Sequence, residues 1–168
     1  LQVAHRPGSK LRLLSSSNDA TAVRFGSGSP SAAKKPVKTT KGLVFDGRTY
    51  LEIAKADDFD MTEKSYSIYA RIRTRKGGPI FAKTPPQDKW VPDGKTLFVR
   101  GGRLAFDIGW VGALQSQTRV NDGKPHDVVA VYDREKAKLR LYVDGKLEAD
   151  GNLQPKKRPR KQVVRIGY

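Results

Sequence analysis

The stretch KLRLYVDGKLEADG, residues 138–151, decides the fold class of this chain of 168 residues. Leu139, Leu141 and Val143 alternate with polar neighbours, which places all three on one face of an extended strand. The Asp144-Gly145 pair that follows can adopt the positive φ angles of a tight hairpin turn. The stretch therefore predicts two antiparallel strands, the first of which turns an apolar face toward a core.

Similar segments recur at intervals of roughly ten residues, with turn residues such as Gly101-Gly102 between them. The expected strands are residues 43–45, 50–53, 67–75, 79–83, 96–100, 103–108, 128–133, 138–143, 146–149 and 163–166. No segment keeps a helical period with capping residues. A chain with this many short strands closes as a sandwich or a barrel, and we expect an all-β, antiparallel sandwich.

Composition divides the chain into two parts. Residues 1–41 are rich in Ser, Gly, Pro and Lys and are expected to form a basic arm or linker with one strand at residues 20–25. Residues 42–168 are expected to fold as one sandwich domain. No apolar run reaches the roughly 20 residues that cross a bilayer, so no membrane span is expected.

The charge of the chain is strongly positive: 33 Lys and Arg stand against 17 Asp and Glu, a formal net charge of +16. Such a surface attracts polyanions, among them sulfated or uronic polysaccharides, nucleic acids and acidic lipids. The alternative is a solvated surface that only keeps the protein soluble. Nucleic acid is not the expected partner, because the strand pattern matches no recognised nucleic-acid-binding fold.

Four segments resemble the laminin G-like jelly-roll domains of the concanavalin A-like lectin/glucanase superfamily. They are GLVFDGRTYLEI (42–53), YSIYARIRTR (66–75), RVNDGKPHDVVAVYD (119–133) and KLRLYVDGKLEADG (138–151), in the family's order and spacing. Residues 95–112 are also similar to modules of large secreted proteins from planctomycete-type bacteria. The resemblance implies an antiparallel jelly-roll β-sandwich within a larger secreted, periplasmic or cell-surface protein.

The chain departs from the family pattern at three places. Arg71 and Pro125 stand where the second and third segments usually carry tryptophan. The family's closing strand, of the type G-x-I-D-E-V-R-I-Y, is also missing. Either the chain is truncated or the arm supplies the missing strand, for which residues 20–25 are the candidate, since an open sheet edge invites association.

Catalysis by the superfamily's glycosidases needs an E-x-D-x-x-E strand, which places two carboxylates on one sheet face. The nearest match is Glu148-Ala149-Asp150, but Leu153 occupies the third acidic position. The G-x-S-x-G, H-E-x-x-H and P-loop motifs are absent as well. We therefore expect a non-catalytic protein, although a pair of carboxylates in a groove would reverse that expectation.

Calcium is the one cofactor that the resemblance raises. Family members often hold a structural calcium near the FDG turn, with oxygen ligands from the opening and closing strands. By this resemblance Asp46 is a candidate ligand, although its partners would belong to the missing closing strand.

Two tryptophans lie in polar surroundings and are candidate binding residues. Trp90 lies between Lys89 and Asp93, and Trp110 follows Asp107. An exposed indole can stack on a sugar ring while neighbouring polar groups bond the hydroxyls. Trp90, which lies near a proline and charged residues, is the favoured stacking residue. The alternative is that one or both tryptophans belong to the core.

A second candidate surface is basic and aromatic. Tyr69, Arg71 and Arg73 share the outward face of one strand, and Arg140 and Tyr142 would join them if both strands lie in one sheet. Arginines there could bind sulfate or carboxylate groups of a glycan through paired hydrogen bonds. The alternative is an exposed strand with solubilising charges.

The expected function is therefore a non-catalytic carbohydrate-binding or adhesion module that recognises a polysaccharide, with an anionic one favoured by the charge. The alternative is a structural or protein–protein interaction domain that docks through its basic surface onto an acidic protein or onto other domains of a parent protein. Burial of both tryptophans would favour this alternative.

Overall fold

The computed structural model describes residues 2–4, 11–12, 23–27, 37–39, 42–53, 56–86, 91–156 and 161–167. Its strands are β1 (Gln2–Ala4), β2 (Leu11–Arg12), β3 (Val23–Ser27), β4 (Val37–Thr39), β5 (Gly42–Val44), β6 (Thr49–Ile53), β7 (Tyr66–Arg73), β8 (Gly78–Thr84), β9 (Lys95–Arg100), β10 (Arg103–Ile108), β11 (Gly112–Arg119), β12 (Pro125–Asp133), β13 (Lys138–Val143), β14 (Lys146–Asn152) and β15 (Val163–Ile166). A short 3-10 helix, η1 (Ala56–Asp58), follows β6.

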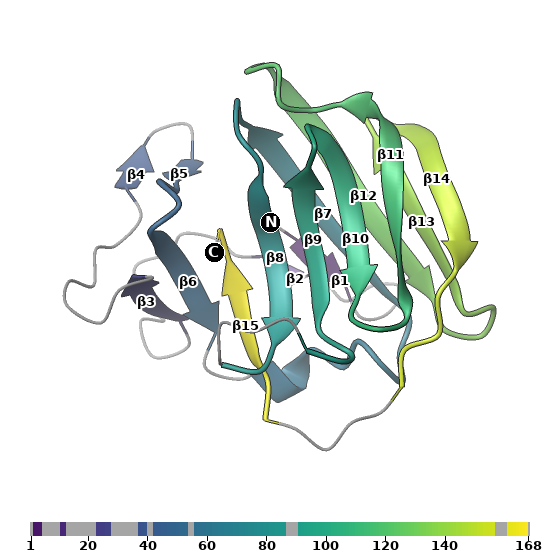
Figure 1. Cartoon of the computed structure of the whole chain (residues 1–168). Helices are drawn as coiled ribbons and strands as arrows, with labels where there is room; N and C mark the ends of the chain where they lie inside the picture. The colour runs from purple at the N-terminus through teal and green to yellow at the C-terminus, as the bar shows by residue number, and fades with distance from the viewer. Residues whose placement is uncertain are drawn as a thin grey trace.

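Two antiparallel sheets face each other as the layers of a sandwich (Figure 1). The six-stranded sheet has the order β14-β13-β12-β7-β1-β2, and the seven-stranded sheet has the order β11-β10-β9-β8-β15-β6-β3. β4 and β5 form a separate pair. The antiparallel sandwich expected from the sequence is thus confirmed.

Each strand expected between residues 43 and 166 is present, with its ends within three residues of the expected ones. One further strand, β11, has no counterpart among the expected strands. Its sequence, GALQSQTR, contains a single large apolar side chain, Leu114, so the alternation that marks the other strands is missing. β11 lies at the edge of its sheet, where a strand needs less apolar surface.

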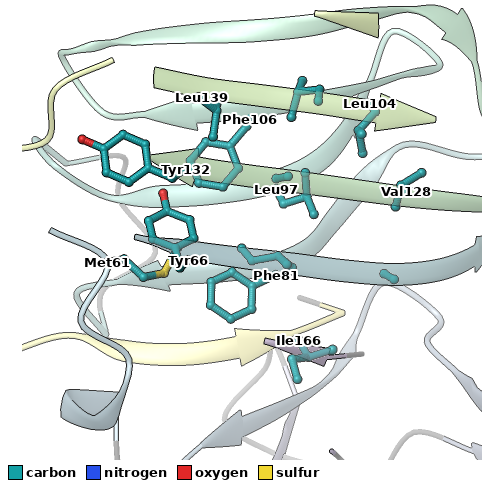
Figure 2. Packing of buried hydrophobic residues seen from close by; sticks show 14 of the residues in the cluster. Met61, Tyr66, Phe81, Leu97, Leu104, Phe106, Val128, Tyr132, Leu139 and Ile166 are labelled. Atoms are coloured by element: carbon teal, nitrogen blue, oxygen red, sulfur yellow. The ribbon is translucent and has the colours of Figure 1, made fainter. Parts of the chain in front are cut away.

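The core lies between the two sheets. In the six-stranded sheet Ile68, Ala130 and Leu141 are register partners on adjacent strands, and all three are buried. Phe81 and Leu97, also register partners, meet them from the seven-stranded sheet, and Figure 2 shows both in the packed interior. Each fully buried side chain of this size contributes about 1.5–3 kcal/mol.

β11 and β14, the edge strands of the two sheets, lie side by side (Figure 1). Glu148 on β14 accepts hydrogen bonds from the backbone N–H groups of Gln117 (3.0 Å) and Thr118 (2.9 Å) and from the Thr118 hydroxyl (2.8 Å). These bonds lower the pKa of the Glu148 carboxyl. Asp150 on the same strand pairs with Lys138 at 2.5 Å. Both acidic side chains of the glycosidase-like segment therefore have structural partners.

The N-terminal arm adds strands to both sheets. β1 pairs with β7 in the six-stranded sheet, and β3 pairs with β6 in the seven-stranded sheet. β3 overlaps the strand expected at residues 20–25 and begins three residues later, and β1, β2 and β4 are further strands within residues 1–41. The division into an arm and a sandwich domain stays a prediction. None of the helical segments in the described part of the chain has the length and apolarity to cross a membrane.

Candidate functional site

The outer face of the six-stranded sheet carries the second candidate surface. Tyr69 on β7, Val129 on β12 and Tyr142 on β13 are register partners in one row. Arg71 and Arg140 belong to the neighbouring rows on either side, next to Asp127 and Val131. The strands therefore do lie in one sheet, as the expected surface requires.

Carboxylates on neighbouring strands offset part of the positive charge on this face. The Tyr69 hydroxyl donates a 2.7 Å hydrogen bond to Asp127, and the Arg71 guanidinium lies 3.6 Å from the same carboxylate. The hydrogen bond to Asp127 raises the pKa of Tyr69. Arg140 is a register partner of Asp150 on β14. Arg71 and Arg140 therefore each have a carboxylate on an adjacent strand.

Arg73 lies at the end of this face and contacts a loop rather than a neighbouring carboxylate. Its Nε donates a 2.8 Å hydrogen bond to the backbone oxygen of Gly123. The Gly123 N–H in turn donates to the backbone oxygen of Thr74 at 3.0 Å. Arg73 therefore holds the loop before β12 against the end of β7.

Trp110 is the most exposed large apolar side chain of the described residues, with 79% of its surface accessible. It lies in the turn between β10 and β11, which the 2.9 Å hydrogen bond from Val111 N to Ile108 O closes. Its φ angle is +65°, in the left-handed region that bulky residues rarely adopt. Asp107, at the end of β10, is mostly covered, and its burial raises the pKa of its carboxyl. Trp110 and Asp107 therefore differ in their access to a ligand.

Backbone hydrogen bonds join the Trp110 turn to the loop before β9. Gly109 N donates to Gly94 O and Asp93 N donates to Gly109 O, both at 2.8 Å. A Cβ atom on Gly109 would lie 2.1 Å from the backbone oxygen of Val91, so only glycine fits this close approach. The backbone that carries Trp110 is therefore held in place. Lys89 and Trp90, which precede Val91, lie outside the described residues.

Asp93 is buried rather than presented to a ligand, with 4% of its surface exposed. Its carboxylate lies 2.9 Å from the Lys95 ammonium, which also donates to the Asp93 backbone oxygen at 3.0 Å. The sequence indicates an exposed loop carboxylate here. The structure differs because Lys95 points into the sandwich, where its charge needs a partner.

A second lysine also points inward beside this pair. Lys83 on β8 is the register partner of Lys95, and its ammonium donates a hydrogen bond to the backbone oxygen of Phe59. Burial lowers the pKa of both lysines. Sequence analysis missed this polar layer, although lysine at two inward positions of the strand alternation was a signal that could have found it.

His126 lies at the start of β12 between two turns. Its Nδ1 lies 2.8 Å from Asp144 Oδ2, and its Nε2 lies 3.1 Å from Asp122 Oδ1. The hydrogen bond with Asp144 has the largest effect and raises the pKa of His126. Burial lowers this pKa, and the hydrogen bond with Asp122 raises it, so the net shift is upward. The two aspartates occupy both ring nitrogens, so the histidine ties the turns together.

Asp46, the candidate calcium ligand, is engaged within its own turn. Its Oδ1 accepts hydrogen bonds from Arg48 N (2.8 Å) and Thr49 Oγ1 (3.1 Å) within its own turn. No group of three or more potential His, Cys, Asp or Glu ligands occurs in the part of the chain that the structure describes. Calcium also takes backbone, amide and water oxygens, so calcium binding at Asp46 stays a prediction.

Comparison with known proteins adds a family and several structural likenesses. The family described as the concanavalin A-like lectin/glucanases superfamily, of the laminin G type, matches residues 45–168. The laminin subunit alpha-4 of Mus musculus is 37% identical over 101 residues, which cover 57% of this chain and 5% of that protein. The chain therefore spans a small part of this relative.

Three solved structures share the fold. The mouse laminin alpha1 chain, domains LG4-5, has a TM-score of 0.52 at 24% identity, covering 82% of this chain and 39% of that one. Domain 4 of AbnA, an extracellular arabinanase of Geobacillus stearothermophilus in complex with arabinotriose, has a TM-score of 0.63 at 10% identity, covering 86% and 72%. The CBM40 of the Ruminococcus gnavus IT-sialidase has a TM-score of 0.54 at 12% identity, covering 62% and 64%.

The profile match, the laminin relative and the sandwich topology agree with the resemblance of the four sequence segments. The jelly-roll expectation is thereby confirmed along with the antiparallel sandwich. The chain belongs to the laminin G-like family of the concanavalin A-like lectin/glucanases superfamily.

Proposed function

We propose that this chain is a non-catalytic carbohydrate-binding module of a larger secreted, periplasmic or cell-surface protein, and that Trp110 is its stacking residue. The observation that carries the proposal is an indole with 79% of its surface exposed on a backbone held at a φ angle of +65°. The fold of the turn does not require tryptophan, since glycine would adopt this φ angle without strain. Exposed aromatic surface on a fixed support is typical of a binding site.

The left-handed backbone conformation at Trp110 costs conformational free energy. A non-glycine residue in the left-handed region costs about 1–2 kcal/mol. The side chain returns little of this free energy, because most of its apolar surface remains in water. Strain that persists without a packing gain is concentrated at functional sites. This reasoning favours selection of Trp110 for a ligand rather than for stability.

The ligand class is proposed from charge and from the structural likenesses. A formal net charge of +16 favours a polysaccharide with acidic groups. Two of the proteins with this fold are a carbohydrate-binding module and a domain in complex with arabinotriose, which supports carbohydrate as the ligand. The hydrogen bonds of Glu148 and the ion pair of Asp150 support a non-catalytic role, because both carboxylates are already engaged.

A polysaccharide array at two salt concentrations tests the proposal. It should contain neutral, uronic and sulfated polysaccharides, with DNA as a charge control. We expect selective binding that survives moderate salt and that Trp110→Ala abolishes. Leu147→Ala, which removes another exposed apolar side chain, is the matched control and should bind like the wild type. Binding to every polyanion that disappears with salt would instead indicate charge alone.

A second function, docking of a protein partner, is favoured by one specific observation. The row of Tyr69, Val129 and Tyr142 continues on β14 with Leu147, which is exposed, and forms an apolar stripe across four strands. Such a stripe suits a protein interface in a larger assembly. If neither the wild type nor Trp110→Ala binds any polysaccharide on the array, this function is favoured over carbohydrate binding.

A further inference from the structure

Three arginines lie side by side on neighbouring strands of the seven-stranded sheet. Arg103, the first residue of β10, is the register partner of Arg100 on β9 and of Arg119 on β11. Directly paired residues of an antiparallel sheet project from the same face. Val99, adjacent to Arg100 in β9, and Leu104, adjacent to Arg103 in β10, are buried in the core. Because neighbouring residues of a strand point to opposite faces, the arginines point outward.

This arginine row, Arg100–Arg103–Arg119, concentrates charge over a short distance. Neighbouring strands lie about 5 Å apart, so the three side chains leave the sheet within about 10 Å of one another. All three residues are exposed. Like charges directly opposite each other destabilise a sheet, so the row weakens the fold that carries it.

Carboxylates compensate the row only in part. Asp107 lies 3.8 Å from Arg100, while no ion pair joins Arg103 or Arg119 to a carboxylate of the described residues. Asp122, the acidic residue of the loop that follows β11, is held by His126 and by the backbone N–H of Lys124. The row therefore differs from the outer face of the other sheet, where Arg71 and Arg140 have aspartates beside them.

The side chains of Arg100 and Arg119 extend in different directions from the row. Arg100 lies over the ring of Phe98, 5.2 Å from its centroid. A Cβ atom added at Gly102 would lie 2.8 Å from Nη2 of Arg119, so this guanidinium lies over the turn between β9 and β10. Arg75 packs in the same way against Gly123 in the next loop. The guanidinium groups of Arg75 and Arg119 thus lie beside two loops at the same end of the sandwich.

We propose that the arginine row binds the sulfate or carboxylate groups of an acidic polysaccharide. Guanidinium groups bind such oxyanions through paired, charge-assisted hydrogen bonds, which would offset the repulsion within the row. The row lies at the opposite end of β10 from the Trp110 turn (Figure 1). The inference rests on the proposed function and assigns the acidic groups of its ligand to a site that Trp110 does not reach.

The test compares Arg103→Gln/Arg119→Gln with Lys64→Gln/Lys136→Gln, which removes two exposed charges elsewhere. Heparin, as the sulfated probe, and alginate, as the uronic probe, are titrated between 50 and 200 mM salt beside a neutral polysaccharide. We expect the arginine variant to lose about tenfold or more in affinity for at least one acidic probe. The slope of log K against log salt should fall by about 1–2, because two contacts that release counterions are lost.

The outcomes separate this inference from the proposed function. Neutral binding should be unchanged in the arginine variant and lost in Trp110→Ala. The inference is overturned if the arginine and lysine variants show the same affinities and salt slopes for both acidic probes. If the wild type binds no polysaccharide, the proposed function fails, and anion binding by the arginine row is then tested with inorganic sulfate alone. Sulfate should then raise the Tm of the wild type more than that of the arginine variant at equal ionic strength, and equal shifts would overturn the inference.

Discussion

Replacement of Asp93 by asparagine should destabilise the fold strongly, because it leaves the Lys95 ammonium buried without a counter-charge. Lys95 has no exposed surface and lies 2.9 Å from the Asp93 carboxylate. Asparagine is chosen because it tolerates the φ angle of +66° at this position. Loss of stability in Asp93→Asn therefore reports the charge and not the backbone.

The size of the expected loss of stability in Asp93→Asn follows from two limits. Removing one partner of a buried ion pair costs about 3–5 kcal/mol. The loss of stability has an upper limit, because Lys95 can become neutral by releasing its proton. From a reference pKa of 10.5, releasing this proton at pH 7 costs about 5 kcal/mol. A loss of about 3–5 kcal/mol is a large part of the about 5–15 kcal/mol that stabilises a domain. It should lower the Tm by about 6–20 °C for a chain of this size.

The pH dependence of this loss has a definite sign. Burial lowers the pKa of Lys95 in the folded protein, so the unfolded chain binds the proton more strongly between that lowered pKa and 10.5. Stability therefore rises with pH through this window. Removing the Asp93 charge lowers the pKa further, so the difference between variant and wild type should shrink as the pH rises.

Urea unfolding of wild type, Asp93→Asn and Asp93→Asn/Lys95→Met at pH 7 and pH 9 measures these effects. We expect the double variant to recover much of the loss, since it removes the stranded charge. A single variant as stable as the wild type at pH 7 would refute the reasoning, as would a loss that is independent of pH.

Three further predictions concern the framework of the sandwich. His126→Gln should flatten the pH dependence of the unfolding midpoint: the pKa of His126 is raised above 6.5, so its stabilisation is complete below that pH and is lost as the pH rises through the folded-state pKa. Glu148→Gln should speed amide hydrogen exchange at Gln117 and Thr118 and cost about 1 kcal/mol in urea unfolding, whereas unchanged exchange would mean that other contacts hold β11. Leu139→Ala should cost about 2–5 kcal/mol in the same assay, and a smaller loss would place Leu139 outside the rigid core.

Much of the fold could be predicted from the sequence because alternation and turn residues agree along most of the chain. Leu139, Leu141 and Val143 face the core as their spacing indicates. β1, β2, β4 and β11 could not be predicted in this way, since few apolar side chains mark them. Their pairing depends on partners that are distant in the sequence, and a single segment does not report such partners.

The candidate site was predictable only in part. The polar neighbours of Trp110 marked it as a candidate, but its exposure depends on the clamped turn, which the sequence does not reveal. Lys95 and Asp93 are five and three residues beyond Trp90 in a polar loop, yet they form a buried pair. The arginine row depends on strand register, which brings Arg103 beside two arginines from different strands.

The most direct test of the account is tryptophan fluorescence of a Trp90→Phe variant, in which Trp110 is the one remaining indole. The variant is titrated with the polysaccharide that the array selects, with and without iodide as a quencher. We expect the ligand to shift the emission of Trp110 and to protect it from iodide, with the same dissociation constant as binding itself. Full binding with unchanged emission and unchanged quenching would contradict the central claim that Trp110 stacks on the sugar.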